Sequence, residues 1–358
     1  MNETNPDTGL SGTRDSAGRT PLPLTVGVGC SAAAGCVLAA YQRGVPPTAY
    51  EGERLASRKR DRPIGMPQKQ ESRTLQKLEQ ISSLMLTLVV SILALSAPAA
   101  AKSPRDIVSR HDRNSTVTVD HAGWDRLLSQ FVKPGADGLN RVDYAAFKAR
   151  GHDQLKTYLL SMGRIDPRVL NRNEQFAYLA NLYNAKTIDI VLDHYPVRSI
   201  KDISLGGGLF AAFTGGPWKA KVVSINGVSL SLDDIEHEIL RKVYWDPRVH
   251  YAVNCASIGC PNLGSRAFSG AKLDVLLESA ARDFVNSPRG VRIQGDRVMV
   301  SSIYEWFKAD FGGNDTGVLR HLMKYAEPLL AAKLKSIGAI ANHDYDWRLN
   351  DIKTAGGL

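Results

Sequence analysis

One segment of this sequence limits the fold more than any other, because it is helical in pattern and apolar nearly all the way round. It runs from Asn173 to His194 and reads NEQFAYLANLYNAKTIDIVLDH. At 100° per residue, one face holds Glu174, Tyr178, Asn181, Ala185, Ile188 and Leu192, and the opposite face holds Phe176, Leu179, Tyr183 and Ile190. Such a helix is buried on all sides, so its polar side chains need partners in the interior.

Shorter helices and hairpins are expected around this central helix. Asn226-Gly227 lies between two alternating runs, which is a strong signal for a β-hairpin. The patterns predict helices at 124–131, 143–161 with a break near Gly151, 232–244, 271–286, 303–310 and 316–335, hairpins at 221–230 and 291–301, and a strand at 248–255. The fold class that follows is α+β, with short antiparallel hairpins and a central buried helix.

The first hundred residues have the character of targeting material. Residues 81–101 carry no charge, follow a basic stretch and end in Ala99-Ala100-Ala101. This pattern predicts a signal peptide or membrane anchor over 66–101, and therefore an exported protein, periplasmic or secreted. We expect contact with a membrane only if the segment 81–101 stays uncleaved.

The two segments on either side of that leader differ in composition. Residues 1–65 are expected to be a non-native or disordered extension, whereas residues 102–358 are expected to form a single α+β domain with the character of an enzyme. The body 102–358 holds 34 Lys and Arg against 28 Asp and Glu, a net charge of +6. No basic run with interleaved aromatic residues appears in it, so a nucleic-acid partner is not expected.

Cys255 is the candidate nucleophile. It follows the predicted strand and opens a turn that contains Gly259 and Pro261, where a side chain can project into a cleft. A nucleophilic cysteine needs a base, and His237 lies at the edge of the apolar stripe of the 232–244 helix. His250 alternates on the predicted strand and faces away from Cys255, which argues against direct pairing of the two.

The base needs a carboxylate to orient it, and Glu174 at the start of the buried helix is our candidate. Glu236 cannot easily orient His237, because neighbouring residues on a helix point about 100° apart. It is expected to pair instead with an arginine such as Arg248 or Arg348. Candidates to contact substrate or to donate to an oxyanion are Asn181, Asn184, Asn254 and His250.

Two other interpretations use the same cysteines and histidines. In the first, Cys255 and Cys260 form a disulfide, which is natural in an exported chain and fits a non-enzymatic binding module. In the second, His237, His250, Cys255 and Cys260 bind a metal, but their spacing matches no standard zinc pattern. We therefore expect neither a metal nor a cofactor.

Several motifs together resemble the family catalogued as domain of unknown function 547 (DUF 547). The resemblance covers roughly Trp124 to Asn350, and rests on Asn173–Tyr178, Asn181–Ala185, Leu232–His237, Asp246–Ser257, Cys260-Pro261 and Tyr345–Trp347. Where the family's first motif commonly reads Phe-Trp-Ile-Asn, this chain has Ala177-Tyr178-Leu179-Ala180-Asn181, which changes the expected shape of the cleft.

The resemblance implies a papain-like cysteine peptidase fold with the triad in permuted Glu–His–Cys order, matching Glu174, His237 and Cys255. It also implies similarity to enzymes that act on glutathione-like γ-glutamyl peptides. The expected function is that of an exported cysteine hydrolase or acyl transferase acting on a peptide or amide bond. Its expected partner is a peptide or thiol-peptide substrate.

Overall fold

The computed structural model describes residues 76–85, 102–205 and 216–354. The predicted extension 1–65 and most of the predicted leader 66–101 lie outside these residues. Within the leader, residues 76–85 are helical. Among the described helices, none combines the length and the apolar character needed to cross a membrane.

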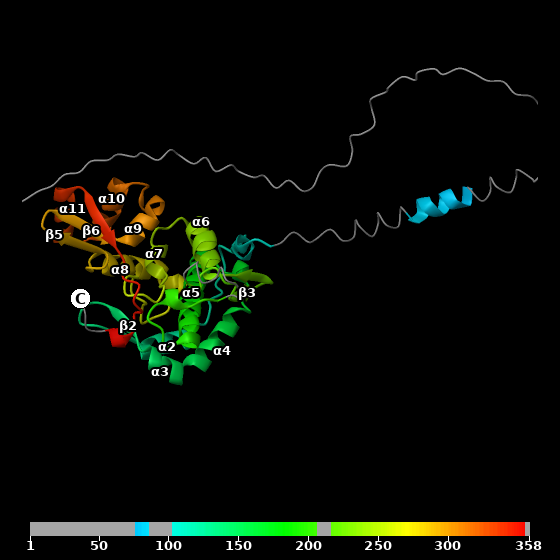
Figure 1. Ribbon diagram of the computed structural model, residues 1–358, viewed down its shortest axis with the longest axis horizontal. Helices are drawn as coiled ribbons and strands as arrows, with labels where there is room; N and C mark the ends of the chain where they lie inside the picture. The colour runs from blue at the N-terminus through cyan, green and yellow to red at the C-terminus, as the bar shows by residue number, and fades with distance from the viewer. Residues whose placement is uncertain (1–75, 86–101, 206–215, 355–358) are drawn as a thin grey trace, which may run out of the picture. The chain divides into compact units, whose positions relative to one another are not determined.

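The central helix α5 (Arg172–His194) is buried on nearly all sides, as predicted. Asn171 caps it, since its side chain accepts a hydrogen bond from the backbone N–H of Glu174 at 3.0 Å. Helices α3 (Tyr144–Arg150) and α4 (His152–Met162) pack against α5, and α2 (Ala122–Phe131) packs against α3 and α4. All three belong to the cyan and green part of Figure 1. The predicted break at Gly151 separates α3 from α4.

The strands form three small sheets, which confirms the α+β class. The hairpin of β3 (Val223–Ile225) and β4 (Val228–Leu230) turns at Asn226 and Gly227, whose φ angles of 52° and 74° are both positive, as a type I′ turn requires. A second hairpin joins β1 (Val132–Pro134) to β2 (Asn140–Val142). The third sheet has the order β5 (Val291–Gln294), β6 (Arg297–Ser301), β7 (Ile340–Asp344), with β7 parallel to β6.

The remaining helices are short. Those that follow the β3–β4 hairpin are a π-helix η5 (Asp234–Leu240), α6 (Arg241–Tyr244), α7 (Val249–Ala252), η6 (Gly270–Lys272), α8 (Leu273–Val285), α9 (Ser302–Trp306), η7 (Lys308–Phe311), α10 (Asp315–Tyr325), α11 (Pro328–Ile337) and η8 (Ile352–Thr354). Earlier 3₁₀ turns are η1 (Pro104–Val108), η2 (Pro167–Val169) and η3 (Ile200–Asp202). Helices α9, α10 and α11 belong to the orange and red part of Figure 1, together with β6.

Two hydrophobic cores divide the described body between them. The first is built around α5, and the second lies among α8, α10 and the three-stranded sheet. The helix α7 contributes to both, because Tyr251 is buried in the second core while Ala252 and Val253 are buried in the first. The helix α7 therefore lies between the two cores, a few residues before Cys255.

The predicted strand at 248–255 is wrong, since its central residues form the helix α7. Four consecutive side chains, from Val249 to Ala252, are buried, so their apolar character does not mark one face of a strand. A local contact starts the helical turn: the Asp246 carboxylate accepts a hydrogen bond from the backbone N–H of Arg248 at 2.9 Å. The predicted helix at 232–244 is present, but most of it is the π-helix η5.

His321 makes the stability of the second core dependent on pH. The Tyr251 hydroxyl lies 2.8 Å from His321 Nε2, and burial lowers the pKa of His321 from 6.5 to about 4. Between pH 6.5 and 4 the unfolded chain takes up a proton at this histidine and the folded chain does not, so the free energy of unfolding falls as the pH drops from 6.5 to 4.

In urea titrations across this pH range, His321→Gln is expected to reduce the fall in the free energy of unfolding. The exposed control His194→Gln is expected to leave it unchanged, and equal slopes for both variants would contradict the assignment.

Candidate functional site

A cavity of about 230 Å³ collects side chains from segments far apart in the sequence. Its lining includes two cysteines, two histidines, two carboxylates and six aromatic residues, namely Cys255, Cys260, His237, His250, Asp233, Glu236, Tyr183, Trp218, Trp306, Phe307, Tyr345 and Trp347. The rings of Trp306, Tyr345 and Trp347 contact one another, with centroids 4.6 to 5.7 Å apart. The result is a mainly apolar cavity with a small group of titratable side chains.

Cys255 and Cys260 form a disulfide in this structure, with Cα atoms 6.3 Å apart. The Tyr345 hydroxyl lies 3.0 Å from Cys255 Sγ and 3.1 Å from Cys260 Sγ. Cys260 is buried, whereas Cys255 is half-buried. Of the two states considered for this pair, the structure therefore contains the oxidised one, in which neither sulfur is a thiolate nucleophile or a thiolate ligand for a metal.

His237 projects from η5 into the cavity, but within the described part of the chain no carboxylate hydrogen-bonds to its ring. Its Nδ1 lies 3.3 Å from a guanidinium nitrogen of Arg241, and its Nε2 lies 3.7 Å from Asp233 Oδ1. The Glu236 carboxylate is 3.8 Å from Nδ1. Because a guanidinium only donates, His237 Nδ1 is the acceptor in this contact.

His250 projects from α7 into the same cavity and has a close carboxylate partner. Its Nε2 lies 2.7 Å from Asp310 Oδ2, and its ring stacks on Phe307 with the centroids 4.3 Å apart. The expectation that His250 faces away from Cys255 is thus wrong, because it assumed a strand where the chain forms a helix. No sequence pattern indicates Asp310, which lies 60 residues away from His250.

Burial and the carboxylate set the charge of the His250–Asp310 pair. Burial lowers the pKa of His250 below its usual 6.5, more than Asp310 and Glu236 raise it, so the imidazole is neutral at neutral pH. Burial by itself would raise the pKa of Asp310, but hydrogen bonds from His250 and Arg241 outweigh it and hold that pKa well below its usual range. An ionised Asp310 accepts from Nε2–H, which leaves the Nδ1 lone pair of His250 free.

Glu174 does not line this cavity, contrary to its expected role as the partner of His237. It is 3% exposed, and its two carboxylate oxygens accept hydrogen bonds from the backbone N–H groups of Val119 at 2.8 Å and Gly270 at 2.7 Å. A buried carboxylate at the first turn of α5 satisfies two backbone donors in this way. Its role in the structure is to join two loops to the central helix.

The three asparagines considered as oxyanion donors are also bound to the backbone. Asn184 donates to the carbonyl of Ala252 and accepts from the N–H of Asn254, both at 2.8 Å. The Asn254 side chain donates to the carbonyl of Pro261 at 2.7 Å and accepts from the N–H of Ala256 at 2.8 Å. Asn181 binds both backbone groups of Phe268. Asn184 and Asn254 therefore hold the backbone on both sides of Cys255.

Glu236 differs from expectation as well, because it has no arginine partner of the kind predicted. Arg248 pairs with Asp246 and Asp274, each at 2.7 Å, and Arg348 pairs with Asp346 at 2.5 Å. The Glu236 carboxylate faces the cavity, 3.9 Å from His250 Nδ1.

The buried hydroxyl of Tyr345 is a functional candidate that reasoning about single residues missed. The sequence does contain an indication of its importance, since Tyr345 begins one of the motifs on which the family resemblance rests.

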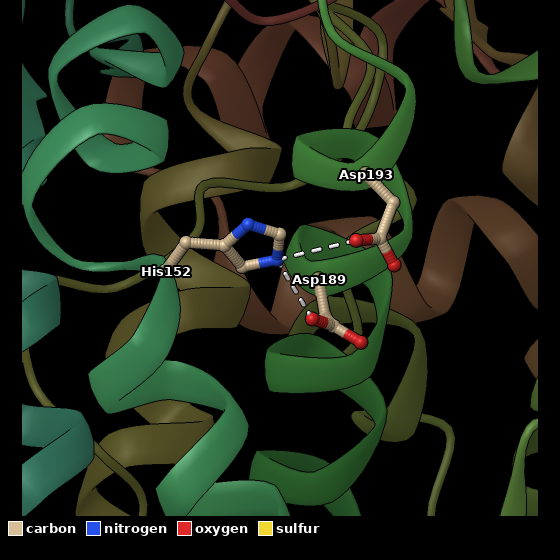
Figure 2. Close-up of side chains that lie close together, drawn as sticks. All are labelled: His152, Asp189 and Asp193. Carbon is tan, nitrogen blue, oxygen red and sulfur yellow. Dashed lines mark hydrogen bonds and ion pairs between the residues drawn. The ribbon is translucent and has the colours of Figure 1, made fainter.

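A second group of titratable side chains lies outside the cavity, where α4 meets α5. Figure 2 shows the His152 ring directed at the carboxylates of Asp189 and Asp193, at 3.0 and 3.6 Å. The Lys156 ammonium contacts the same two carboxylates at 3.1 and 3.0 Å, and Lys186 contacts Asp189 at 2.8 Å. Because these lysines neutralise the carboxylates, we interpret the group as an ion-pair network and assign no metal to it.

A protein-family match covers only part of this chain. Residues 167–285 match the family described as "Protein of unknown function, DUF547". The match supports the resemblance found in the sequence for the segment that contains α5, η5, α7 and both cysteines. No curated protein and no solved structure matches the chain.

The hydrogen bonds of Glu174 predict a structural rather than a chemical phenotype. Glu174→Gln leaves one backbone N–H facing an amide N–H₂ group, which costs about 1–3 kcal/mol of stability because that donor is buried. Urea unfolding should show this loss, while the control Glu238→Gln, an exposed side chain at 39%, should change stability by less than about 0.5 kcal/mol. Equal stability of wild type and Glu174→Gln would show that these bonds contribute nothing.

Proposed function

We propose that this protein is an exported cysteine hydrolase or acyl transferase of papain-like character, which cleaves a peptide or amide bond with Cys255 in its reduced form. The observation that carries the proposal is the lining of one cavity by Cys255, by two imidazoles and by a buried tyrosine hydroxyl. A thiol nucleophile, a base and a hydrogen-bond donor are the groups that acyl transfer through a thioester requires. The DUF547 match covers Cys255 and both histidines, whereas Tyr345 lies outside it.

His250 is a better candidate for the base than His237. Its neutral ring has a free Nδ1, because Nε2–H is bound to the Asp310 carboxylate at 2.7 Å. This is the arrangement in which a carboxylate fixes the tautomer and orientation of a catalytic imidazole. The Nδ1 of His237, in contrast, already accepts from Arg241. We therefore assign the base to His250 and its orientation to Asp310.

The hydroxyl of Tyr345 is our candidate donor to the oxyanion. It lies 3.0 Å from Cys255 Sγ, the atom that attacks the carbonyl carbon. Burial raises the pKa of Tyr345, so the hydroxyl keeps its proton and remains a donor.

The proposed reaction has two steps. His250 takes the thiol proton as Cys255 Sγ attacks, the amine leaves with that proton, and water then hydrolyses the thioester.

The substrate we propose is a peptide or thiol-peptide, with a γ-glutamyl or glutathione-like structure as the first class to test. A cavity of about 230 Å³ holds one side chain or a small acyl group rather than a long peptide. Its aromatic side chains, among them Trp218, Trp306 and Trp347, provide apolar and stacking contacts for such a group.

The alternative is a non-enzymatic exported module that binds its ligand with the same cavity. The disulfide between Cys255 and Cys260 favours it, since a binding module needs no thiolate. The two candidates differ in one respect that is easily measured. The hydrolase works only after the disulfide is reduced, whereas the binding module retains its affinity in the oxidised state.

The assignment of the base gives a direct comparison between two histidine variants. After reduction with a dithiol, His250→Ala is expected to lower kcat/KM for peptide and glutathione-conjugate substrates by about 10²–10⁴-fold, because the base is lost. The matched variant His237→Ala is expected to lose less. Amine release measured under saturating and limiting substrate provides kcat and KM separately. A greater loss in His237→Ala would reverse the assignment.

Cys255→Ala tests whether the reaction proceeds through a thioester at all. The variant is expected to abolish turnover in the reduced protein, since no other group forms the covalent intermediate. Unchanged turnover in Cys255→Ala would overturn the proposed function. If the reduced wild-type protein binds these peptides without cleaving them, the binding module is the correct candidate.

A further inference from the structure

The two cysteines of the disulfide differ in their exposure. Cys260 is only 4% exposed, whereas Cys255 is half-buried, and both line the cavity. Thiol–disulfide exchange requires a thiolate to reach one sulfur along the line of the S–S bond, so access decides which sulfur is attacked. A small thiol that enters the cavity therefore reaches Cys255 Sγ more readily than Cys260 Sγ.

Hydrogen-bond donors favour Cys260 as the leaving sulfur. The backbone N–H of Cys255 is a fixed donor to Cys260 Sγ at 2.9 Å, and the Tyr345 hydroxyl lies 3.1 Å from the same sulfur. The polar contacts of Cys255 Sγ are with two hydroxyls, Tyr345 at 3.0 Å and Ser257 at 3.2 Å, each of which has one proton to share among its partners. A fixed donor stabilises a thiolate more strongly than an uncharged sulfur. Because a more stable thiolate leaves faster, attack at Cys255 with departure of Cys260 is the favoured direction.

The segment between the two cysteines is held in place without the disulfide. The Asn254 side chain bridges its ends by donating to the carbonyl of Pro261 at 2.7 Å. Three backbone hydrogen bonds fix its interior to the C-terminal segment. The N–H groups of Ile258 and Gly259 donate to the carbonyls of Arg348 and Asp346, each at 2.8 Å, and the N–H of Asn350 donates to the carbonyl of Ala256 at 3.1 Å. A disulfide that closes so short a loop constrains the unfolded chain less than one that closes a long loop, and these hydrogen bonds order the segment in addition to it.

We propose that Cys255 and Cys260 are an exchangeable redox pair, opened by a low-molecular-weight thiol of the glutathione class that enters the cavity and attacks Cys255. In the first step the external thiolate forms a bond to Cys255 Sγ, the S–S bond breaks, and its electron pair goes to Cys260 Sγ. In the second step another thiolate attacks the external sulfur of the mixed disulfide and releases Cys255 as a thiolate. Two thiols become one external disulfide, and the protein disulfide becomes two thiols.

This exchange is an activity of its own, and it also controls the same site. Reduction supplies the Cys255 thiol that the hydrolase needs, and oxidation removes it. That second consequence rests on the proposed function, whereas the exchange does not. The tests below read out thiols and glutathione adducts only, so a failure of hydrolysis leaves their result intact.

The first experiment exposes the oxidised, folded full chain to reduced glutathione and then alkylates all free thiols. Peptide sequencing by mass spectrometry assigns each adduct to its cysteine, which also separates Cys30 and Cys36 from the pair. Cys255 and Cys260 are expected to become alkylated at glutathione concentrations that leave the circular dichroism and the tryptophan fluorescence unchanged. If they stay joined until a denaturant is added, the disulfide is structural and the proposal is overturned.

A matched pair of variants tests which of the two sulfurs a glutathione-sized reagent reaches, with the cysteine thiolate attacking oxidised glutathione and reduced glutathione leaving. Oxidised glutathione is expected to form a mixed disulfide with Cys255 in Cys260→Ala and to react far more slowly with Cys260 in Cys255→Ala. Equal rates in the two variants would contradict the assigned direction.

Tyr345→Phe tests the leaving sulfur. The loss of one donor to a charged sulfur is expected to slow opening of the wild-type disulfide by about tenfold, and an unchanged rate would overturn the role of Tyr345.

Discussion

The burial of α5 on nearly all sides is the constraint on which the rest of the structure depends. A polar side chain on such a helix costs free energy unless a hydrogen bond satisfies it, so each one fixes another part of the chain. Glu174 holds two loops, and Asn184 holds the backbone between Ala252 and Asn254. The position of Cys255, one residue further on, thus follows from a hydrogen bond inside the hydrophobic core.

The sequence predicted elements whose signal is local and failed where the signal comes from tertiary contacts. The buried helix, the Asn226-Gly227 hairpin and the α+β class follow from periodicity and turn chemistry. The supposed strand before Cys255 is a helix, because burial between two cores produces the same apolar run. Glu174 was placed correctly at the first turn of α5, but its partners are loop amides that no spacing reveals. The partnership of His250 with Asp310 likewise appears only when α7 and η7 come together.

The cavity combines two chemistries that exclude each other at any one time. As proposed, Cys255 bonded to Cys260 is an oxidant for small thiols, whereas free Cys255, which lines the same cavity as the neutral His250, is a nucleophile. Tyr345 contributes to both, since its buried hydroxyl lies within 3.1 Å of each sulfur. One set of contacts can therefore stabilise a leaving thiolate in the oxidised form and a developing oxyanion in the reduced form.

The central claim of this account is that Cys255 is a reactive thiol activated by His250. The most direct test is the rate of alkylation of each cysteine in the reduced, folded full chain as a function of pH. The account predicts that Cys255 is alkylated with a midpoint well below the usual thiol pKa of about 8.5, ahead of the buried Cys260, and that His250→Ala moves this midpoint upward. A midpoint of about 8.5 or higher for Cys255 in the wild-type protein, unchanged by His250→Ala, would contradict it.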